Sequence, residues 1–191
     1  MLGTGLVIGI AGPAGAGKDT VANFIVDSMG FVKASFATPI KEMMSVLGLT
    51  YEQLHGDLKE VVDPRYGRTP RHMMQTLGTE WGRQMIRGDI WARALFVEIQ
   101  RCSERFAHDT TTINYVVADV RFNNEAQLLR EKGGWIIHIE GRDAGVGSDH
   151  ASEAGVEWHE NDMVIDNSGE LHELVNACQP IIERLHEEIS E

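Results

Sequence analysis

A glycine-rich stretch near the start of the chain, GPAGAGKDT (Gly12–Thr20), carries residue types that bind phosphate. Gly12, Gly17 and the lysine that follows match the phosphate-loop pattern GxxxxGK. The glycines let consecutive backbone N–H groups converge on an anion, and a helix that begins after the loop adds a favourable dipole. The lysine adds a positive charge for the outer phosphates. The sequence therefore predicts nucleoside triphosphate binding by Gly12, Ala14, Gly15, Ala16, Gly17, Lys18, Asp19 and Thr20.

Asp19 occupies the position at which such loops usually carry a serine or threonine that binds Mg²⁺. A carboxylate holds the same ion directly or through water, and the ion offsets the repulsion between the carboxylate and the phosphates. We therefore predict a Mg²⁺ site at Asp19 and Thr20 that forms together with bound nucleotide. The alternative is that Asp19 only caps the helix while Thr20 supplies the oxygen contact.

A second group of polar residues follows the apolar run INYVVADV (Ile113–Val120). Asp119 lies at the end of this run, where it can hold a metal-bound water or orient the attacking group, although it can also cap a helix. Arg121 presents a planar fork of donors that suits a phosphate. The predicted catalytic residues are Lys18, Asp19, Asp119 and Arg121.

The elements that must position these residues alternate between strand and helix. Short apolar runs predict strands at 5–12, 31–37, 113–120, 135–141 and 163–167, while the middle of the chain has mostly helical spacing. We expect helix caps at Thr38, at Thr50 with Gln53, at Thr69 and at Asn167, and a kink of the last helix at Pro180. Such alternation predicts a mostly parallel sheet with right-handed crossovers and helices on both faces. Ligands of such sheets bind beyond the carboxyl ends of the strands, and the loop, Asp119 and Arg121 all follow predicted strand ends.

The competing dinucleotide-binding pattern fits poorly. Gly15 and Gly17 begin it, but Thr20 stands where the third glycine or alanine is needed. No acidic residue follows the second predicted strand at the ribose position.

Composition restricts the partners. The chain has 191 residues and a net charge of −12, so we expect no nucleic-acid partner. No apolar run is long enough for a membrane span, and we expect no export signal. Cys102 and Cys178 lack metal-like spacing and are expected to be buried thiols, as in a reducing cytoplasm. Residues 59–93 carry seven basic against four acidic residues, which indicates either a site for a small anion or a solvated helical face.

Several segments together resemble the bacteriophage-type deoxynucleoside monophosphate kinases. They are, in order, GAGKDT, FATPIKE, TPRHMMQTLGTEWGRQ, GDIW, ADVRFNNEA, HASE and VIDNSGEL. The resemblance covers nearly the whole chain, and the GKD loop is usual in that family. It implies transfer of a phosphoryl group from ATP, with Mg²⁺, to a deoxynucleoside 5′-monophosphate. It also implies a three-layer P-loop nucleoside monophosphate kinase-like α/β fold with a five-stranded, mostly parallel sheet.

The same resemblance assigns residues to roles. It implies one P-loop kinase domain over 1–191, with a helical monophosphate-binding region at 38–110 and a lid at 142–162. The implied substrate-binding residues are Lys41, Arg71, Asp89, Trp91, Arg121, Arg142, His150 and Glu153, and the nucleotide base would contact Asn167. The expected compartment is the cytoplasm, that of the host if the chain is phage-encoded. The resemblance is compatible with any of the four bases on the monophosphate and with either a monomer or a homodimer.

Two other functions compete with this one. The first is phosphorylation of a different small acceptor such as dephospho-coenzyme A, by enzymes that share the loop but are not expected to carry LGTEWGR. The second is a non-catalytic P-loop switch, although the chain lacks the asparagine–lysine–x–aspartate signature of guanine-binding switches. The polar segment that contains His150, Glu153, His159 and Asp162 has the residue types of a cation site, but such segments are more often polar loops, and we expect a loop here.

Overall fold

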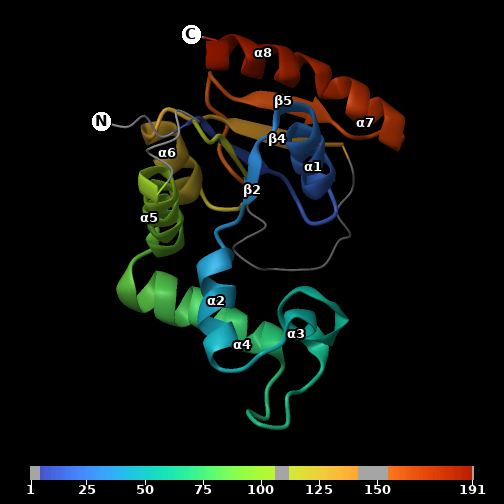
Figure 1. The fold of residues 1–191 in the computed structure, drawn as a ribbon. Helices are drawn as coiled ribbons and strands as arrows, with labels where there is room; N and C mark the ends of the chain where they lie inside the picture. The colour runs from blue at the N-terminus through green and yellow to red at the C-terminus, as the bar shows by residue number, and fades with distance from the viewer. Residues whose placement is uncertain (1–4, 106–111, 142–154, 191) are drawn as a thin grey trace. The chain divides into compact units, whose positions relative to one another are not determined.

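The computed structural model describes residues 5–105, 112–141 and 155–190, and the chain divides into two compact units. The first, here called the sheet unit, contains Met1–Ser35 and Ile99–Glu191. The second, the helical unit, contains Phe36–Glu98. The boundary between them falls within helix α5 (Ile90–Arg105), so this one helix belongs to both units (Figure 1).

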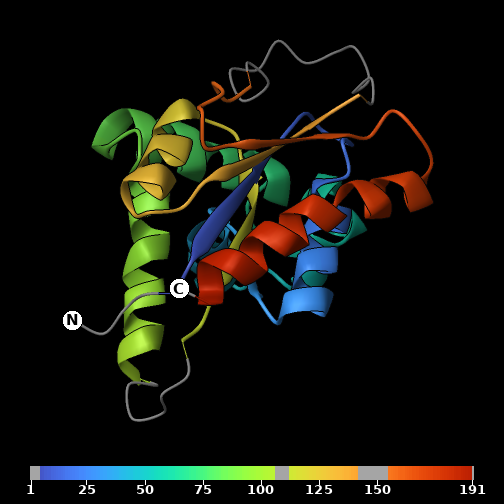
Figure 2. The same cartoon turned by 90° about the horizontal axis from the view of Figure 1, so that it is seen from above.

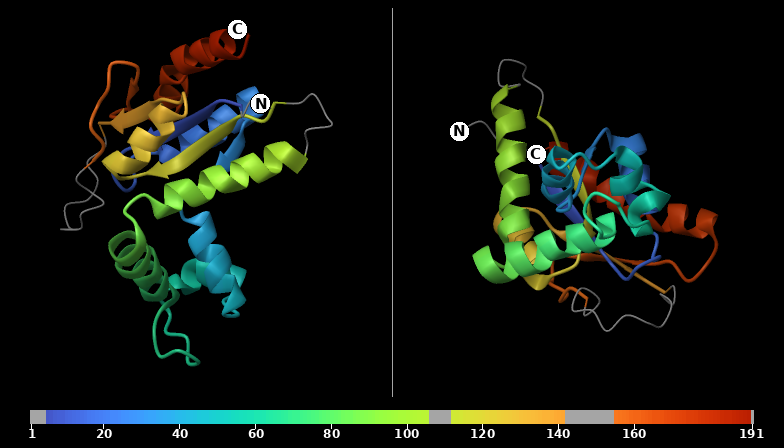
Figure 3. Two further views of the ribbon diagram at one scale, coloured as in Figure 1. Left: turned by 90° about the vertical axis from the view of Figure 1, so that its left-hand side faces the viewer. Right: turned by 90° about the horizontal axis from the view of Figure 1, so that it is seen from below.

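The sheet unit is built on five parallel strands, seen side by side in Figure 3, in the order β2-β3-β1-β4-β5. Their bounds are β1 (Val7–Ala11), β2 (Val32–Ala34), β3 (Tyr115–Val120), β4 (Ile136–Glu140) and β5 (Met163–Asp166). The five predicted strands and the predicted parallel arrangement are confirmed. From β1 the chain crosses to β2 on one side, whereas from β3 it crosses to β4 on the other. The carboxyl ends of β1 and β3 therefore flank the point where strand order reverses, where such sheets bind ligands.

Helices cover both faces of this sheet (Figure 2). α1 (Lys18–Met29), α7 (Leu171–Ala177) and α8 (Gln179–Ser190) pack on one face, where Ile8, Ile10 and Ile137 belong to the same buried cluster as Ile25 of α1 and Leu185 of α8. α6 (Asn123–Glu131) packs on the opposite face. A methyl group at Gly9 of β1 would lie 2.7 Å from the Leu129 side chain of α6, so this glycine allows the helix to approach the strand closely.

The helical unit contains α2 (Thr38–Val46), α3 (Tyr51–His55), the short 3-10 helix η1 (Asp57–Glu60), α4 (Pro70–Thr76) and the π-helix η2 (Leu77–Ile86), followed by the start of α5. Met44, Leu49 and Leu54 form its small buried cluster, against which Met73 and Leu77 pack. π-helical turns are rare and frequent at functional sites. Here the π-helix coincides with the LGTEWGR segment.

Two glycines explain how the π-helix packs. A methyl group at Gly82 would lie 2.5 Å from Cζ2 of the Trp91 ring, so the ring rests directly on this backbone. The Trp91 indole N–H donates to the carbonyl of Gly78 at 2.8 Å, and the side chain is only 3% exposed. The two glycines that weaken the helical pattern in the sequence thus allow a tryptophan of α5 to contact η2.

Several predicted helix ends are confirmed, and two are wrong. Thr38 does not cap α2, because it is the first residue of that helix and the N-cap position is Ala37. Thr50 and Gln53 form the expected capping box, and Thr69 accepts from the backbone N–H of His72. Asn167 does not cap the last helix, because its amide is used elsewhere and Glu170 precedes α7 instead. Pro180 lies beside a break that separates α7 from α8. No helix in the described ranges is both long and apolar enough to cross a membrane.

Candidate active site

The glycine-rich loop leaves the carboxyl end of β1 and leads directly into α1. Gly15 and Gly17 have φ values of 78° and 95°, a region that favours glycine, and Gly17 precedes the first residue of α1. No side chain among the described residues caps the first N–H groups of α1. These N–H groups, together with the helix dipole, provide the donors that a bound phosphate requires.

Lys18 lies over this loop. Its Nζ donates to the carbonyl oxygens of Gly12 at 2.7 Å and Pro13 at 2.6 Å. Burial and the nearby Arg121 guanidinium lower the pKa of Lys18, while the carboxylates of Asp19 and Asp119 oppose that shift. Arg121, Asp19 and Asp119 therefore all lie near enough to Lys18 for their charges to act on it.

Asp19 lies in the first turn of α1 and points toward β2. Its carboxylate forms an ion pair with Nζ of Lys33 at 2.7 Å, and Lys33 also donates to the side chain of Asn23 at 3.0 Å. The Asp19 side chain is 83% exposed, so Lys33 is an exchangeable surface partner and not a buried one. An exposed carboxylate beside the loop is a suitable oxygen ligand for Mg²⁺, and the adjacent Thr20 hydroxyl is of the same ligand type.

Asp119 and Arg121 are positioned by the end of β3. Ala11 of β1 lies opposite Val120 of β3, so Asp119, next to the last residue of β3, and Arg121, just after the strand, lie at the edge where the glycine-rich loop starts. The hydroxyl of Ser35, just after β2, donates to Oδ2 of Asp119 at 2.7 Å. This contact fixes the carboxylate at the edge where the loop begins.

The backbone at Arg121 is held by a buried glutamate. Glu125 is 1% exposed, and its Oε2 accepts from the backbone N–H groups of Arg121 at 3.0 Å and Phe122 at 3.2 Å. Two donors that precede α6 are thereby satisfied inside the protein. Glu125 thus fixes the turn that carries Arg121, which accounts for the glutamate in the sequence DVRFNNEA.

Asn167, just after β5, contacts the backbone of the glycine-rich loop. Its Nδ2 donates to the carbonyl of Ala16 at 2.8 Å, and its own backbone N–H donates to Glu140. The residue is 2% exposed, and its Oδ1 has no partner among the described residues. Asn167 therefore ties the last strand to the loop across 151 positions of sequence.

The helical unit holds the other described substrate candidates. Asp89 is paired with Arg87 at 2.5 Å and Arg93 at 2.8 Å; burial opposes its ionisation, but the two guanidinium groups outweigh this and lower its pKa. Arg71 pairs with Glu60 of η1. Nζ of Lys41 lies 3.2 Å from Nδ1 of His55. Trp91, predicted to contact base or sugar, is buried against η2 as described above.

The basic stretch at 59–93 is more neutral than its composition indicates. Arg65 pairs with the buried Asp63, and the pairs at Arg71, Arg87 and Arg93 account for three more of its seven basic residues. The Asp63 carboxylate also accepts from Gln53, and these hydrogen bonds hold the pKa of Asp63 well below its ordinary value. Much of this positive charge therefore serves the architecture of the unit.

Comparison with known proteins decides the family. A family model described as deoxynucleotide monophosphate kinase matches residues 50–178. A protein of Acanthamoeba polyphaga mimivirus, provisionally named a deoxynucleotide monophosphate kinase, is 31% identical over 189 residues, which cover 88% of this chain and 91% of that protein. The chain belongs to the deoxynucleotide monophosphate kinase family. The deoxynucleoside-5′-monophosphate kinase of Escherichia phage T5 is also similar, with 27% identity over 220 residues that cover 79% of this chain and 85% of the relative.

The fold likeness extends to other kinases. A sugar kinase from a Janibacter species has a TM-score of 0.50 and 17% identity, with 94% of this chain and 95% of that chain covered. At this identity the likeness concerns the fold alone. This chain thus has the P-loop kinase-like fold that the sequence predicted, a five-stranded parallel sheet with helices on both faces.

Three residues of this family member escaped the sequence prediction. Lys33, Ser35 and Glu125 contact Asp19, Asp119 and the backbone of Arg121 respectively. The only available signals were that Ser35 lies near the end of the predicted strand 31–37 and that Glu125 lies inside a segment characteristic of the family. Arg142, His150 and Glu153, and with them most of the predicted lid, lie outside the described residues.

Asp162, one of the four residues considered as cation ligands, is already occupied by hydrogen bonds within the protein. Asp162 accepts from Arg130 at 2.5 Å, from His138 at 2.9 Å and from the backbone N–H of Ile136 at 3.1 Å. Its side chain is fully buried by these partners. The described ranges contain no group of histidine, cysteine and acidic residues suited to a metal ion.

Proposed function

We propose that this chain transfers the terminal phosphoryl group of ATP to the 5′-phosphate of a deoxynucleoside monophosphate, giving the diphosphate and ADP. The observation that carries the proposal is the phosphate loop placed beside Asp119 and Arg121 at the reversal point of the sheet, in a member of this kinase family. Phosphoryl transfer asks mainly for alignment and for neutralisation of charge, and no side-chain nucleophile is required.

The ATP phosphates would be bound by the N–H groups of the loop and of the first turn of α1. Lys18 would turn from the Gly12 and Pro13 carbonyls to the outer phosphates, since an anion is a stronger partner for an ammonium group. Asn167 holds the loop through the Ala16 carbonyl, and its buried Oδ1 would accept from the exocyclic amine of adenine only after a local rearrangement that exposes it. Arg121, with its backbone fixed by Glu125, would neutralise charge on the transferring group.

Mg²⁺ fits the oxygen ligands at this edge. Asp19 and Thr20 would hold it, with Asp119 in reach of a bound water, and Lys33 would release Asp19 to the cation. When bound, the ion would neutralise phosphate charge during transfer. On the acceptor side, we assign Lys41, Arg71 and Asp89 of the helical unit to the monophosphate.

A coupled assay of ADP production tests the proposal. The purified chain is supplied with ATP, Mg²⁺ and, in turn, each deoxynucleoside monophosphate, each ribonucleoside monophosphate and dephospho-coenzyme A. We expect turnover that depends on a deoxynucleoside monophosphate. Lys18→Ala should lower this turnover at least ~100-fold, the scale of losing one well-placed charge, whereas Lys132→Ala, an exposed lysine at the end of α6, should not. Turnover with dephospho-coenzyme A as the only effective acceptor, or no turnover with any acceptor, would contradict the proposal.

A further inference from the structure

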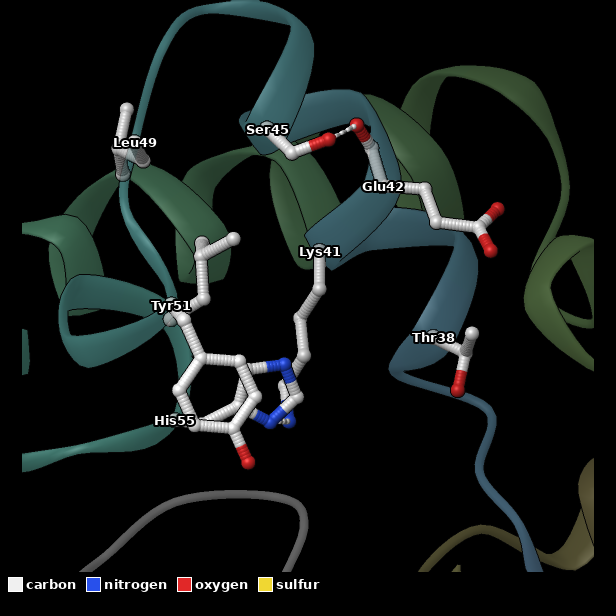
Figure 4. A pocket seen from close by; sticks show the side chains of 8 residues that line it. Thr38, Lys41, Glu42, Ser45, Leu49, Tyr51 and His55 are labelled. Carbon is white, nitrogen blue, oxygen red and sulfur yellow. Dashed lines mark hydrogen bonds between the residues drawn. The ribbon is translucent and has the colours of Figure 1, made fainter.

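The helical unit contains a pocket of about 380 Å³ between α2 and α3 (Figure 4). Thr38 and Lys41 line it from α2, Tyr51 and His55 from α3, and Leu49 and Leu54 supply apolar surface. Its volume lies within the usual range of about 300–1,000 Å³ for small-molecule sites. The combination of an apolar wall with a few converging polar groups is also typical of such sites.

Lys41 and His55 converge within this pocket. In Figure 4 the Lys41 side chain extends to the His55 ring, and its Nζ lies 3.2 Å from Nδ1. An ammonium group only donates, so Nδ1 must be the acceptor and the imidazole is neutral with its proton on Nε2. The ring of Tyr51 stacks on the ring of His55 with centroids 4.5 Å apart, which holds the imidazole in this orientation. The pocket thus presents one cation beside one neutral ring that can become a cation.

The surrounding charges keep the imidazole neutral. Partial burial of the ring, together with the positive charges of Lys41 and Lys59, lowers the pKa of His55 below 6.5. The other charged side chain on α3 is Glu52, whose carboxylate lies beside Gly56. Those on the elements packed against α3 are Glu42 on α2, Asp57 and Glu60 on η1, and Arg71 and His72 on α4. In Figure 4 the Glu42 carboxylate is directed away from His55, and Glu60 is paired with Arg71. An anion entering the pocket would therefore reverse the balance of charge at His55.

The walls of the pocket are fixed without a ligand. Arg65, held by the buried Asp63, donates to the carbonyl of Gly48 at 3.0 Å, and the hydroxyl of Tyr66 donates to the carbonyl of Leu47 at 2.6 Å. These bonds hold the connection that carries Leu49 between α2 and α3. A preformed site loses less conformational freedom when its ligand binds.

We propose that this pocket binds the phosphate of the deoxynucleoside monophosphate between Lys41 and His55, and that His55 takes up a proton as the phosphate enters. This inference rests on the proposed function, because it concerns the acceptor of that reaction. A phosphate monoester carries close to two negative charges at neutral pH, with a second pKa of about 6. Its oxygens accept from both side chains, and its charge stabilises the imidazolium form of His55. The apolar wall at Leu49 and Leu54 then faces the sugar and base.

Titration calorimetry with the four deoxynucleoside monophosphates and with inorganic phosphate tests this inference. Each titration at pH 7.5 is repeated in two phosphate-free buffers with different ionisation enthalpies, and the difference gives the number of protons taken up. We expect uptake by the wild type with any monophosphate that binds. His55→Gln should bind about tenfold more weakly, because a charge-assisted hydrogen bond is replaced by a neutral one, and its proton uptake should disappear.

A matched control and a kinetic readout separate the outcomes. His172→Gln, at an exposed histidine of α7 in the sheet unit, should keep the wild-type affinity and proton uptake. In the coupled assay, His55→Gln should raise KM for the monophosphate and leave kcat and KM for ATP nearly unchanged. Equal proton uptake in the wild type and His55→Gln, or an unchanged KM, would overturn the inference even if turnover is normal. Proton-linked binding without any turnover would instead leave the inference standing and overturn the proposed function.

Discussion

Replacing Gly17 with alanine should destabilise the protein more than the same replacement at Gly15, because only Gly17 faces another side chain. Both glycines have positive φ, so each alanine variant carries a backbone strain of about 1–2 kcal/mol. A methyl group at Gly15 would meet nothing within 4 Å. At Gly17 it would lie 2.8 Å from Nδ2 of Asn167, which must then move away from the Ala16 carbonyl.

The size of the difference follows from that displaced hydrogen bond. A buried carbonyl left without its donor costs about 1–3 kcal/mol. Gly17→Ala should therefore lower the free energy of unfolding by about 2–5 kcal/mol and Gly15→Ala by about 1–2 kcal/mol. For a chain of this length each kcal/mol corresponds to about 2–4 °C in Tm, so the two variants should differ by several degrees.

Urea unfolding followed by circular dichroism, with Asn167→Ala as a second background, isolates this contact. Removing the amide also removes the atom nearest to the new methyl group and leaves only Cδ2 of Leu174, at 3.3 Å. In that background Gly17→Ala should cost about as much as Gly15→Ala, so the coupling energy should be about 1–3 kcal/mol. If Gly17→Ala cost the same in both backgrounds, the contact between Asn167 and the loop would not be the cause and the reasoning would fail.

Three further outcomes are expected. Gly82→Ala should lower the free energy of unfolding by about 1–3 kcal/mol through overpacking against Trp91. Gly78→Ala should cost less, because its nearest contact is the terminal methyl group of Ile40 at 3.0 Å and not a rigid ring at 2.5 Å; thermal denaturation compares the two variants. Glu125→Ala should lower kcat more than Glu125→Gln in the coupled assay, because alanine leaves the two N–H groups after β3 without their acceptor. Asp162 is buried, which opposes ionisation, but its hydrogen bonds outweigh this and keep its pKa below 3.8. The stabilisation it provides is thus present above about pH 4 and lost as pH falls through the lowered pKa, so acid unfolding curves of the wild type should show a decline that Asp162→Asn lacks.

The arrangement at the ends of β1 and β3 could be predicted because its signals are local. Glycine spacing identifies the loop, apolar runs identify the strands, and parallel order then brings Lys18 and Asp119 to one edge of the sheet. The ion pair of Asp19 with Lys33 could not be predicted in this way. It joins a helix to a strand whose relative rotation depends on how the core packs, and neither residue has a periodic pattern that marks it.

The role of Asn167 shows a second limit. A capping asparagine and an asparagine that holds a distant loop have the same local sequence, so the choice between them depends on a partner 151 positions away. The basic stretch at 59–93 shows a third. Composition counts charges but does not show which are neutralised, and Arg65 is engaged by a buried carboxylate only two residues earlier. The sequence therefore locates the phosphate loop, but it does not show which of the surrounding basic residues are already paired with carboxylates.

Trp91, packed on the π-helix, is a buried fluorophore of the helical unit, and the sheet unit has a buried tryptophan of its own. Of the four tryptophans, Trp91 and Trp81 lie in the helical unit, where one is enclosed and the other is 38% exposed. Trp135 and Trp158 divide in the same way in the sheet unit, at 2% and 61% exposed. Enclosed indoles fluoresce at shorter wavelengths than hydrated ones, so variants that retain a single tryptophan would report the melting or ligand response of either unit separately, without an added dye.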